Sequence, residues 1–470
     1  MATVVWDPQQ WAKRQFGDCE LGNAQRTQRL IKVAVQLANR PDVSLPNQTE
    51  EWGDCKAAYR LFNQDEVTFQ KIIAPHCRQT REACRPGEVK LILNDTTEID
   101  YTGHRKTTGL GPIGNGRGRG FFLHTAMMVD DGPQHAIEGL AAQDIFYRKA
   151  STGKQKSRSK DSQRSTADRE SAVWGRVFDA VGRPPEGVVW KHICDRGADD
   201  VEVLWRARHN GCGFVIRGSR MQRKVLSPDG RELPLVDYLA ELPVQGETRV
   251  VTAQSKKKGV TRQATVSLRF GEVLIPLSRT LTPWLKAHRP TEPLRVGIVE
   301  LRELSPPDGE KAVRWVLFVD TPVTSIEQAD QEIVRYEQRW AIEEYHKALK
   351  TGCGVERRQL RTADRLERLL GVSAVVAVRL VQLKTAARET PERPARELVP
   401  ARWIKILQID GKRPMNPDLS IHAFLRMLAQ KGGFLARKRD GEPGWLTIWR
   451  GFDKLILLVR GADAERGNDG

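Results

Sequence analysis

Two apolar runs in the first half of the chain each lead into an aspartate. Residues 89–94 read Val-Lys-Leu-Ile-Leu-Asn and precede Asp95, and residues 188–194 read Val-Val-Trp-Lys-His-Ile-Cys and precede Asp195. Runs of this length and composition are typical of short buried strands. Ligands of an open α/β sheet bind in the crevice at the carboxyl ends of its strands, so the pattern predicts that the two aspartates converge there.

A third segment, residues 336–350, contains no Pro or Gly and is rich in helix formers. It predicts one helix that ends near Thr351-Gly352. At about 100° per residue, one narrow stripe of that helix carries an acid, a tyrosine and three cations, namely Tyr336, Arg339, Glu343, Lys347 and Lys350. Glu344 falls off the stripe, and His346 is interpreted as a flanking packing residue. A carboxylate and cations on one face suit a metal ion and a phosphate backbone together.

The wider pattern predicts three parts. Residues 1–70 read as helical, with Asp7 and Asn23 as helix caps. Residues 71–375 alternate strands with helices, and β-branched runs between Pro/Gly turns predict a β-rich insertion at about 213–320. Residues 376–470 read as a C-terminal helical domain with apolar faces that pack within the domain or across a subunit interface.

Two basic stretches are interpreted as surface features. Residues 148–160 are polar and free of large apolar side chains, which predicts a mobile loop. Lys256, Lys257 and Lys258 form either a hairpin tip against DNA or simply a soluble turn, and the residues favour neither interpretation.

Charge points to a polyanionic partner. Lysine and arginine number 76 against 59 aspartates and glutamates, a formal net charge of +17, which makes nucleic acid the first candidate, although membrane-surface and ribosome-associated proteins are also basic. No stretch reaches the roughly 18 uncharged apolar residues that span a bilayer. The protein is therefore expected in the cytoplasm without membrane contact. The seven scattered cysteines form no C-x-x-C pair, so neither a disulfide framework nor a zinc site is predicted.

Cations also line the second predicted helix, where Arg26 and Arg29 lie on one side. A solvated helix face explains such cations on sequence grounds alone. A helix laid against the DNA backbone is the alternative.

The chain resembles the DDE transposases of the insertion-sequence-four (IS4) family. The resemblance runs nearly from end to end. It is carried by the segments Leu21-Gly22 with Arg26-Thr27-x-Arg29-Leu30, Asp95-Thr96-Thr97, Cys194-Asp195-Arg196, and Arg339-Trp340-x-Ile342-Glu343-Glu344-x-His346-Lys347. The last segment is similar to the family's Tyr-Arg-Glu-Lys signature, borne here by Tyr336, Arg339, Glu343 and Lys347. Related proteins have a glutamate where this chain has Gly197, and the C-terminal domain matches only in patches.

The resemblance implies an α/β fold with a ribonuclease H-like catalytic core. In it, Asp95, Asp195 and Glu343 are the catalytic residues and hold two Mg²⁺ ions, for which Mn²⁺ can substitute. Carboxylate oxygens suit such hard cations. It further implies a homodimer in a synaptic complex with double-stranded DNA, in a bacterial cytoplasm and associated with the nucleoid. The enzyme would cleave at its element's terminal repeats through a hairpin intermediate and join the 3′ ends to target DNA.

Hairpin formation requires a flipped base and an aromatic platform to receive it. Trp315 stands 21 residues before Tyr336, which resembles the position of the family's base-stacking tryptophan. By itself, Trp315 reads as a core tryptophan on a strand. The resemblance implies that Tyr336, Arg339 and Lys347 contact the phosphates beside that base, and that Lys350 and Arg217 contact the backbone.

Two other functions remain possible on sequence grounds. A structure-specific nuclease on the same core would cut DNA but never join it. A domesticated DNA-binding regulator would have lost catalysis, although all three acids and their basic neighbours are intact.

Overall fold

The computed structural model describes residues 7–49, 51–148, 170–245, 249–254, 261–277, 280–437 and 439–468. Most of the basic stretch 148–160 and all of Lys256–Lys258 lie outside these ranges. Side chains of residues 249–254, 460 and 463–468 are also not described.

The N-terminal part is helical, as predicted. Its helices are α1 (Pro8–Phe16), α2 (Ala24–Asn39), α3 (Leu45–Gln48), α4 (Trp52–Leu61) and α5 (Phe69–Glu82). Both predicted caps are present, since Asp7 accepts a hydrogen bond from the Gln10 N–H and Asn23 accepts one from the Arg26 N–H. These caps satisfy amide groups that the first turn of a helix leaves without partners.

The centre of the molecule is a mixed sheet, to which twelve strands contribute within the described ranges. The strands of its first half are β1 (Val89–Asp100), β2 (Gly111–Ile113), β3 (Gly118–Asp130), β4 (Ile137–Phe146), β5 (Val189–Cys194) and β6 (Gly213–Arg217). β3 runs antiparallel to both β1 and β4, whereas β5 runs parallel to both β1 and β6. The order β4-β3-β1-β5-β6 is consistent with the expected ribonuclease H-like core.

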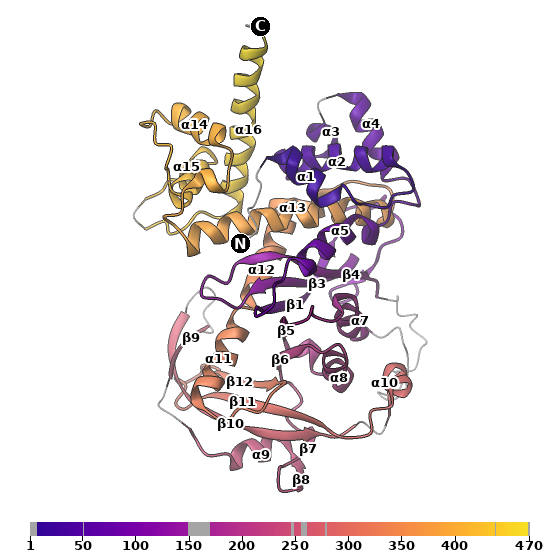
Figure 1. The fold of residues 1–470 in the computed structure, drawn as a ribbon, viewed down its shortest axis with the longest axis vertical. Coiled ribbons are helices and arrows are strands. Elements are labelled where there is room, and N and C mark those ends of the chain that lie inside the picture. The colour runs from indigo at the N-terminus through magenta and orange to yellow at the C-terminus, as the bar shows by residue number, and fades with distance from the viewer. Residues whose placement is uncertain are drawn as a thin grey trace.

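The remaining strands extend this sheet. They are β7 (Lys224–Leu226), β8 (Glu232–Pro234), β9 (Arg249–Gln254), β10 (Thr261–Ile275), β11 (Leu294–Glu303) and β12 (Arg314–Val319). The predicted insertion at about 213–320 includes β6, which pairs with β5, and its last strand β12 returns to pair with β6. The β-rich segment therefore continues the central sheet at the lower end of Figure 1.

Helices cover both faces of the sheet. α7 (Ala172–Val181) and α8 (Val201–His209) pack with Ile92 and Cys194 in one apolar core. Leu91, Leu93 and Ile193 point to the other face and join a larger core with α5, α12 (Trp340–Lys347) and α13 (Ala363–Glu389). This division follows from the alternation of side chains along a strand. The sheet also carries the short helices α9 (Leu235–Glu241) and α10 (Pro283–His288).

One long helix, α13 (Ala363–Glu389), runs between the N-terminal helices and the sheet (Figure 1). By length and composition alone it could cross a membrane, but 78% of its most apolar window is buried inside the protein, as in a core helix. The predicted boundary between residues 375 and 376 falls within α13, and the three domain limits remain a prediction. Beyond it lie α14 (Ala401–Asp410), α15 (Ile421–Lys431) and α16 (Trp445–Asn468). The far end of α16 projects from the body.

Candidate active site

The register of two parallel strands brings Asp95 and Asp195 together. Asn94 of β1 pairs with Cys194 of β5, so the next residues on the two strands are the two aspartates. Each lies two positions beyond a residue of the larger core, Leu93 or Ile193, and therefore faces the same side of the sheet. β1 does not end at Asp95 as predicted, because its pairing with β3 continues to Asp100.

The predicted single helix over 336–350 is wrong. The chain forms α11 (Ile326–Glu337) and α12 (Trp340–Lys347), separated by a turn and followed by a π-helical turn at Ala348–Gly352. At the break, the Arg339 N–H donates to Tyr336 O, and the Ile342 N–H donates to Arg339 O. These hydrogen bonds span three residues, so the backbone tightens locally towards 3₁₀ geometry. Tyr336 and Glu343 thus belong to different helices.

Arg339 lies between two of the predicted metal-binding acids. Its guanidinium donates to Glu343 Oε1 at 2.9 Å and lies 3.8 Å from Asp95 Oδ2. Burial raises the pKa of Asp95 to about 6; the nearby Arg339 charge opposes this rise, while the negative charges of Asp195 and Glu343 add to it. The three acids therefore lie within electrostatic reach of one another.

His346 is a residue that sequence reasoning missed. Its Nδ1 lies 3.9 Å from Asp95 Oδ2, and its Nε2 lies 3.4 Å from Thr125 Oγ1. Burial is the main cause that lowers the pKa of His346 to about 3, so the ring is neutral near pH 7. Residues three apart share a helix face, and that rule places His346 beside Glu343.

The two lysines of the predicted stripe do not lie together. Lys347 is exposed and pairs with Glu344 Oε1 at 2.8 Å. It lies four residues after Glu343 on α12, so the two residues share a helix face, and its contact with DNA remains a prediction. Lys350 lies 3.5 Å from Glu356, and its charge contributes to the lowered pKa of His346. Lys350 belongs to the π-helical turn that follows α12.

Trp315, Tyr336 and Arg217 form a cluster beside Arg339. The rings of Trp315 and Tyr336 meet edge to face with centroids 5.1 Å apart, and the Arg217 guanidinium lies 5.6 Å from the Trp315 ring centroid. Trp315 is partly buried against the larger core. Tyr336 is only 4% exposed, and burial is the main cause that raises its pKa, while Arg217 and Arg339 lower it.

Gly197 supports Asp195 through its backbone. The Gly197 N–H donates to Asp195 Oδ1 at 2.8 Å, within a 3₁₀ turn that follows β5. A Cβ at this position would stand 2.8 Å from a ring carbon of Trp174 and 3.0 Å from Asp195 Oδ1. Trp174 is nearly buried and packs edge to face on His124. A larger residue has no room here while Trp174 keeps this place.

The two N-terminal arginines have partners within the chain. Arg26 donates to Leu21 O and to the Gln64 side chain. Arg29 forms an ion pair of 2.7 Å with Asp54. Their contact with DNA remains a prediction.

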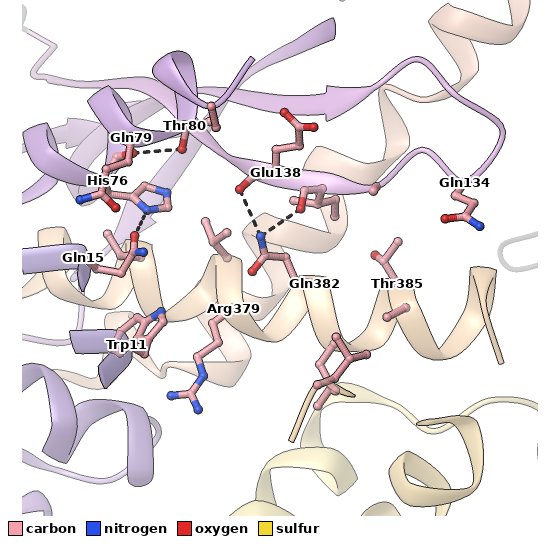
Figure 2. Close-up of a pocket in the computed structure, with 18 of the residues that line it drawn as sticks. Trp11, Gln15, His76, Gln79, Thr80, Gln134, Glu138, Arg379, Gln382 and Thr385 are labelled. Atoms are coloured by element: carbon pink, nitrogen blue, oxygen red, sulfur yellow. Dashed lines mark hydrogen bonds between the residues drawn. The ribbon is translucent and has the colours of Figure 1, made fainter. Parts of the chain in front are cut away.

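One cavity is separate from the predicted catalytic acids. It has a volume of about 390 Å³ and lies among α1, α5, the β3–β4 connection and α13 (Figure 2). Trp11, His76 and Arg379 line it, and Gln382 reaches across to the backbone of Ile137 and Glu138. None of the predicted site residues is among its lining residues.

The donor chemistry of the predicted site suits a hard divalent cation, because all three predicted ligands are carboxylates. Within the described residues, no group of three His, Cys, Asp or Glu side chains stands close enough to hold an ion. The Arg339 guanidinium lies between two of the predicted ligands, since it pairs with Glu343 and lies 3.8 Å from Asp95.

Three family models match the chain in succession. They describe a transposase DNA-binding domain at residues 8–67, a transposase DDE domain at 191–378 and a transposase Tn5 dimerisation domain at 375–469. The chain belongs to the DDE transposases. More narrowly, it is related to the transposases of the Tn5 and IS4 group. Asp195 and Glu343 lie within the DDE match, whereas Asp95 precedes it and is tied to the site by its strand register.

A solved structure of the piggyBac transposase synaptic complex with hairpin DNA is also similar. The identity is 12% and the TM-score 0.41, over 97% of this chain and 86% of that one. A likeness at this level carries no argument about function. The family models alone establish a transposase enzyme with DNA-binding and dimerisation domains, and a DDE domain implies dependence on divalent metal.

Proposed function

We propose that this transposase excises its element by cut-and-paste chemistry, with Asp95, Asp195 and Glu343 as metal-binding catalytic residues. The observation that supports this most directly is the register of β1 and β5, which sets two aspartates side by side. Glu343 joins them through its shared contact with Arg339. The three acids would hold two Mg²⁺ ions, which Mn²⁺ can replace, and these ions would activate the attacking oxygen and stabilise the leaving oxygen.

The cationic residues around the acids would hold the DNA strand. Arg339 is the best placed to bind a phosphate of the DNA, because its guanidinium lies between Asp95 and Glu343. A guanidinium that pairs with a carboxylate can pair with a phosphate in the same way. Lys350 supports the site from the end of α12. Lys347 is exposed, but it would have to break its ion pair with Glu344 before it could bind a phosphate. The N-terminal arginines Arg26 and Arg29 would bind the terminal repeats.

The reaction would pass through a hairpin. Trp315 offers a partly buried ring with Arg217 over it and Tyr336 at its edge, an arrangement that suits a base removed from the duplex. Tyr336 is too deeply buried to contact DNA unless Trp315 or Arg217 shifts. We therefore assign Trp315 to stacking and Tyr336 to supporting that ring.

The test is strand cleavage and joining on linear DNA that carries the element's own terminal inverted repeats, with Mg²⁺ present. We expect wild type to cut, to form a hairpin visible on a denaturing gel, and to insert 3′ ends into a target plasmid. Glu343→Ala should abolish all three products while it still binds the repeats. Cleavage by Glu343→Ala at the wild-type rate would remove that acid from the mechanism.

The same assay separates the alternatives. A structure-specific nuclease would cut but give no plasmid insertion, and an inactive regulator would bind with steep salt dependence yet stay inert with Mg²⁺ and Mn²⁺. For the hairpin, Trp315→Ala should reduce hairpin formation more than first-strand nicking. Trp284→Ala is the matched control, because Trp284 is also partly buried but stacks on His288 of α10. Dimerisation and nucleoid association belong to the same proposal.

A further inference from the structure

The helix that carries Glu343 is poorly fixed by its own sequence. α12 has only eight residues, it begins at Arg339 without a side-chain cap, and a turn and a π-helical segment flank it. Isolated helices this short are unstable in water. Its orientation must therefore come from contacts with the rest of the molecule.

One flank of α12 is packed and another is open. Ile342 and Tyr345 are buried in the larger core, and the Tyr345 hydroxyl accepts from Gln143 Nε2 and donates to Ala374 O. On the flank towards α13, however, a cleft of about 190 Å³ remains, lined by Ala341, Val381 and other residues. Apolar packing does not fix the helix on that flank.

Glu344 spans this cleft. Its Oε2 accepts from Lys384 Nζ of α13 at 2.8 Å and from the indole N–H of Trp445, the first residue of α16, at 3.1 Å. The Lys384 ammonium also lies 4.6 Å from the centroid of the Trp445 ring. All three side chains line the cleft. Lys384 and Trp445 both lie in the stretch matched by the dimerisation model.

We propose that Glu344 is a positioning residue through which the C-terminal domain sets the orientation of α12 and thereby of the Glu343 carboxylate. The two glutamates are adjacent, so their side chains leave the helix about 100° apart. A rotation of α12 that breaks the contacts of Glu344 therefore moves Glu343 relative to Asp95 and Asp195. Misplacement of a catalytic group by 1 Å is enough to cost about 100-fold in rate.

The inference rests on the proposed role of Glu343, and two kinds of variant test it. Glu344→Ala removes both contacts of the Glu344 carboxylate, with Lys384 of α13 and with Trp445 of α16, whereas Trp445→Phe removes only the indole N–H and keeps an apolar ring. We expect about tenfold to 100-fold slower single-turnover cleavage for Glu344→Ala and a smaller loss for Trp445→Phe. Lys384→Met combined with Glu344→Ala should cost no more than Glu344→Ala alone, because residues in one network are not additive.

A second readout separates positioning from a general loss of fold. Mn²⁺ binding, followed by the electron paramagnetic resonance of the free ion, should weaken in Glu344→Ala while repeat binding and thermal stability stay near wild type. Glu232→Gln is the matched control, since Glu232 pairs with Lys224 at the distant β7–β8 edge; it should change neither cleavage nor Mn²⁺ binding.

Wild-type cleavage and Mn²⁺ affinity in both Glu344→Ala and Trp445→Phe would overturn the inference. So would a rate loss in Trp445→Phe matched by an equal loss of thermal stability, because that indicates a merely structural role. If Glu343→Ala also retained activity, the proposed catalytic role itself would fail, and the two failures are thereby distinguished.

Discussion

Substitution of Lys191 by Met should lower the free energy of unfolding more than substitution of a lysine in an exposed ion pair. Lys191 lies on β5, four residues before Asp195, and its ammonium is almost fully buried. It lies 2.6 Å from Glu332 of α11 and 3.0 Å from Asp320. Arg335 pairs with Glu332 at 2.7 Å and with Asp131 at 2.6 Å. The cluster thus joins β5 to the helix that precedes the catalytic segment.

The magnitude follows from the charges that remain. The intact cluster has two cations and three carboxylates; Lys191→Met leaves Arg335 alone against all three. Glu332 keeps Arg335 as a partner, and the Asp320 carboxylate keeps the hydrogen bond from the Phe214 N–H. Removal of one partner of a buried pair costs about 3–5 kcal/mol, and we expect the lower end because Asp320 is 18% exposed.

The assay is denaturant unfolding followed by tryptophan fluorescence, with Lys224→Met as the control. Lys224 forms an ion pair of 2.6 Å with Glu232, but both side chains are largely exposed. Exposed pairs contribute about 0–1 kcal/mol. Equal unfolding midpoints for Lys191→Met and Lys224→Met would refute the reasoning, because burial would then have no effect on the value of the pair.

Further predictions concern a tight contact and the acid response. Gly197→Ala should cost about 1–3 kcal/mol of stability and slow cleavage, since the new Cβ would displace either Trp174 or Asp195; unchanged cleavage and thermal stability would contradict this. Burial lowers the pKa of His192 to about 3, so below about pH 6.5 its ring is protonated in the unfolded chain but stays neutral in the folded protein. The free energy of unfolding should therefore fall as the pH drops below about 6.5. In urea unfolding between pH 6.5 and 4, His192→Phe should show a shallower loss of stability than wild type, and an identical slope would count against it. Arg339→Met should weaken both cleavage and repeat binding at low salt, measured by gel shift, and wild-type behaviour would remove it from the site.

Local patterns were enough to predict the strands that precede Asp95 and Asp195 and the caps at Asp7 and Asn23. These features depend on side-chain alternation and on hydrogen bonds between residues a few positions apart, so a short stretch of sequence is enough to predict them. The N-cap of α8 is Asp200, whose side chain accepts a hydrogen bond from the Glu202 N–H. Asp199 instead pairs with Arg223, a contact that no local rule indicates.

The sequence by itself determined the class of protein, through a family resemblance that depends on residue order, and its strand ends and helical stripe led to the proposal of the three acids. Only the tertiary structure decided how those acids are held. The break before α12 interrupts a helix that helix propensity alone would continue. The contacts of His346 with Asp95, and of Glu344 with α13 and α16, join segments that are far apart in the chain. Their physical reason is packing and charge pairing between distant elements, which outweigh the small helix preferences of single residues.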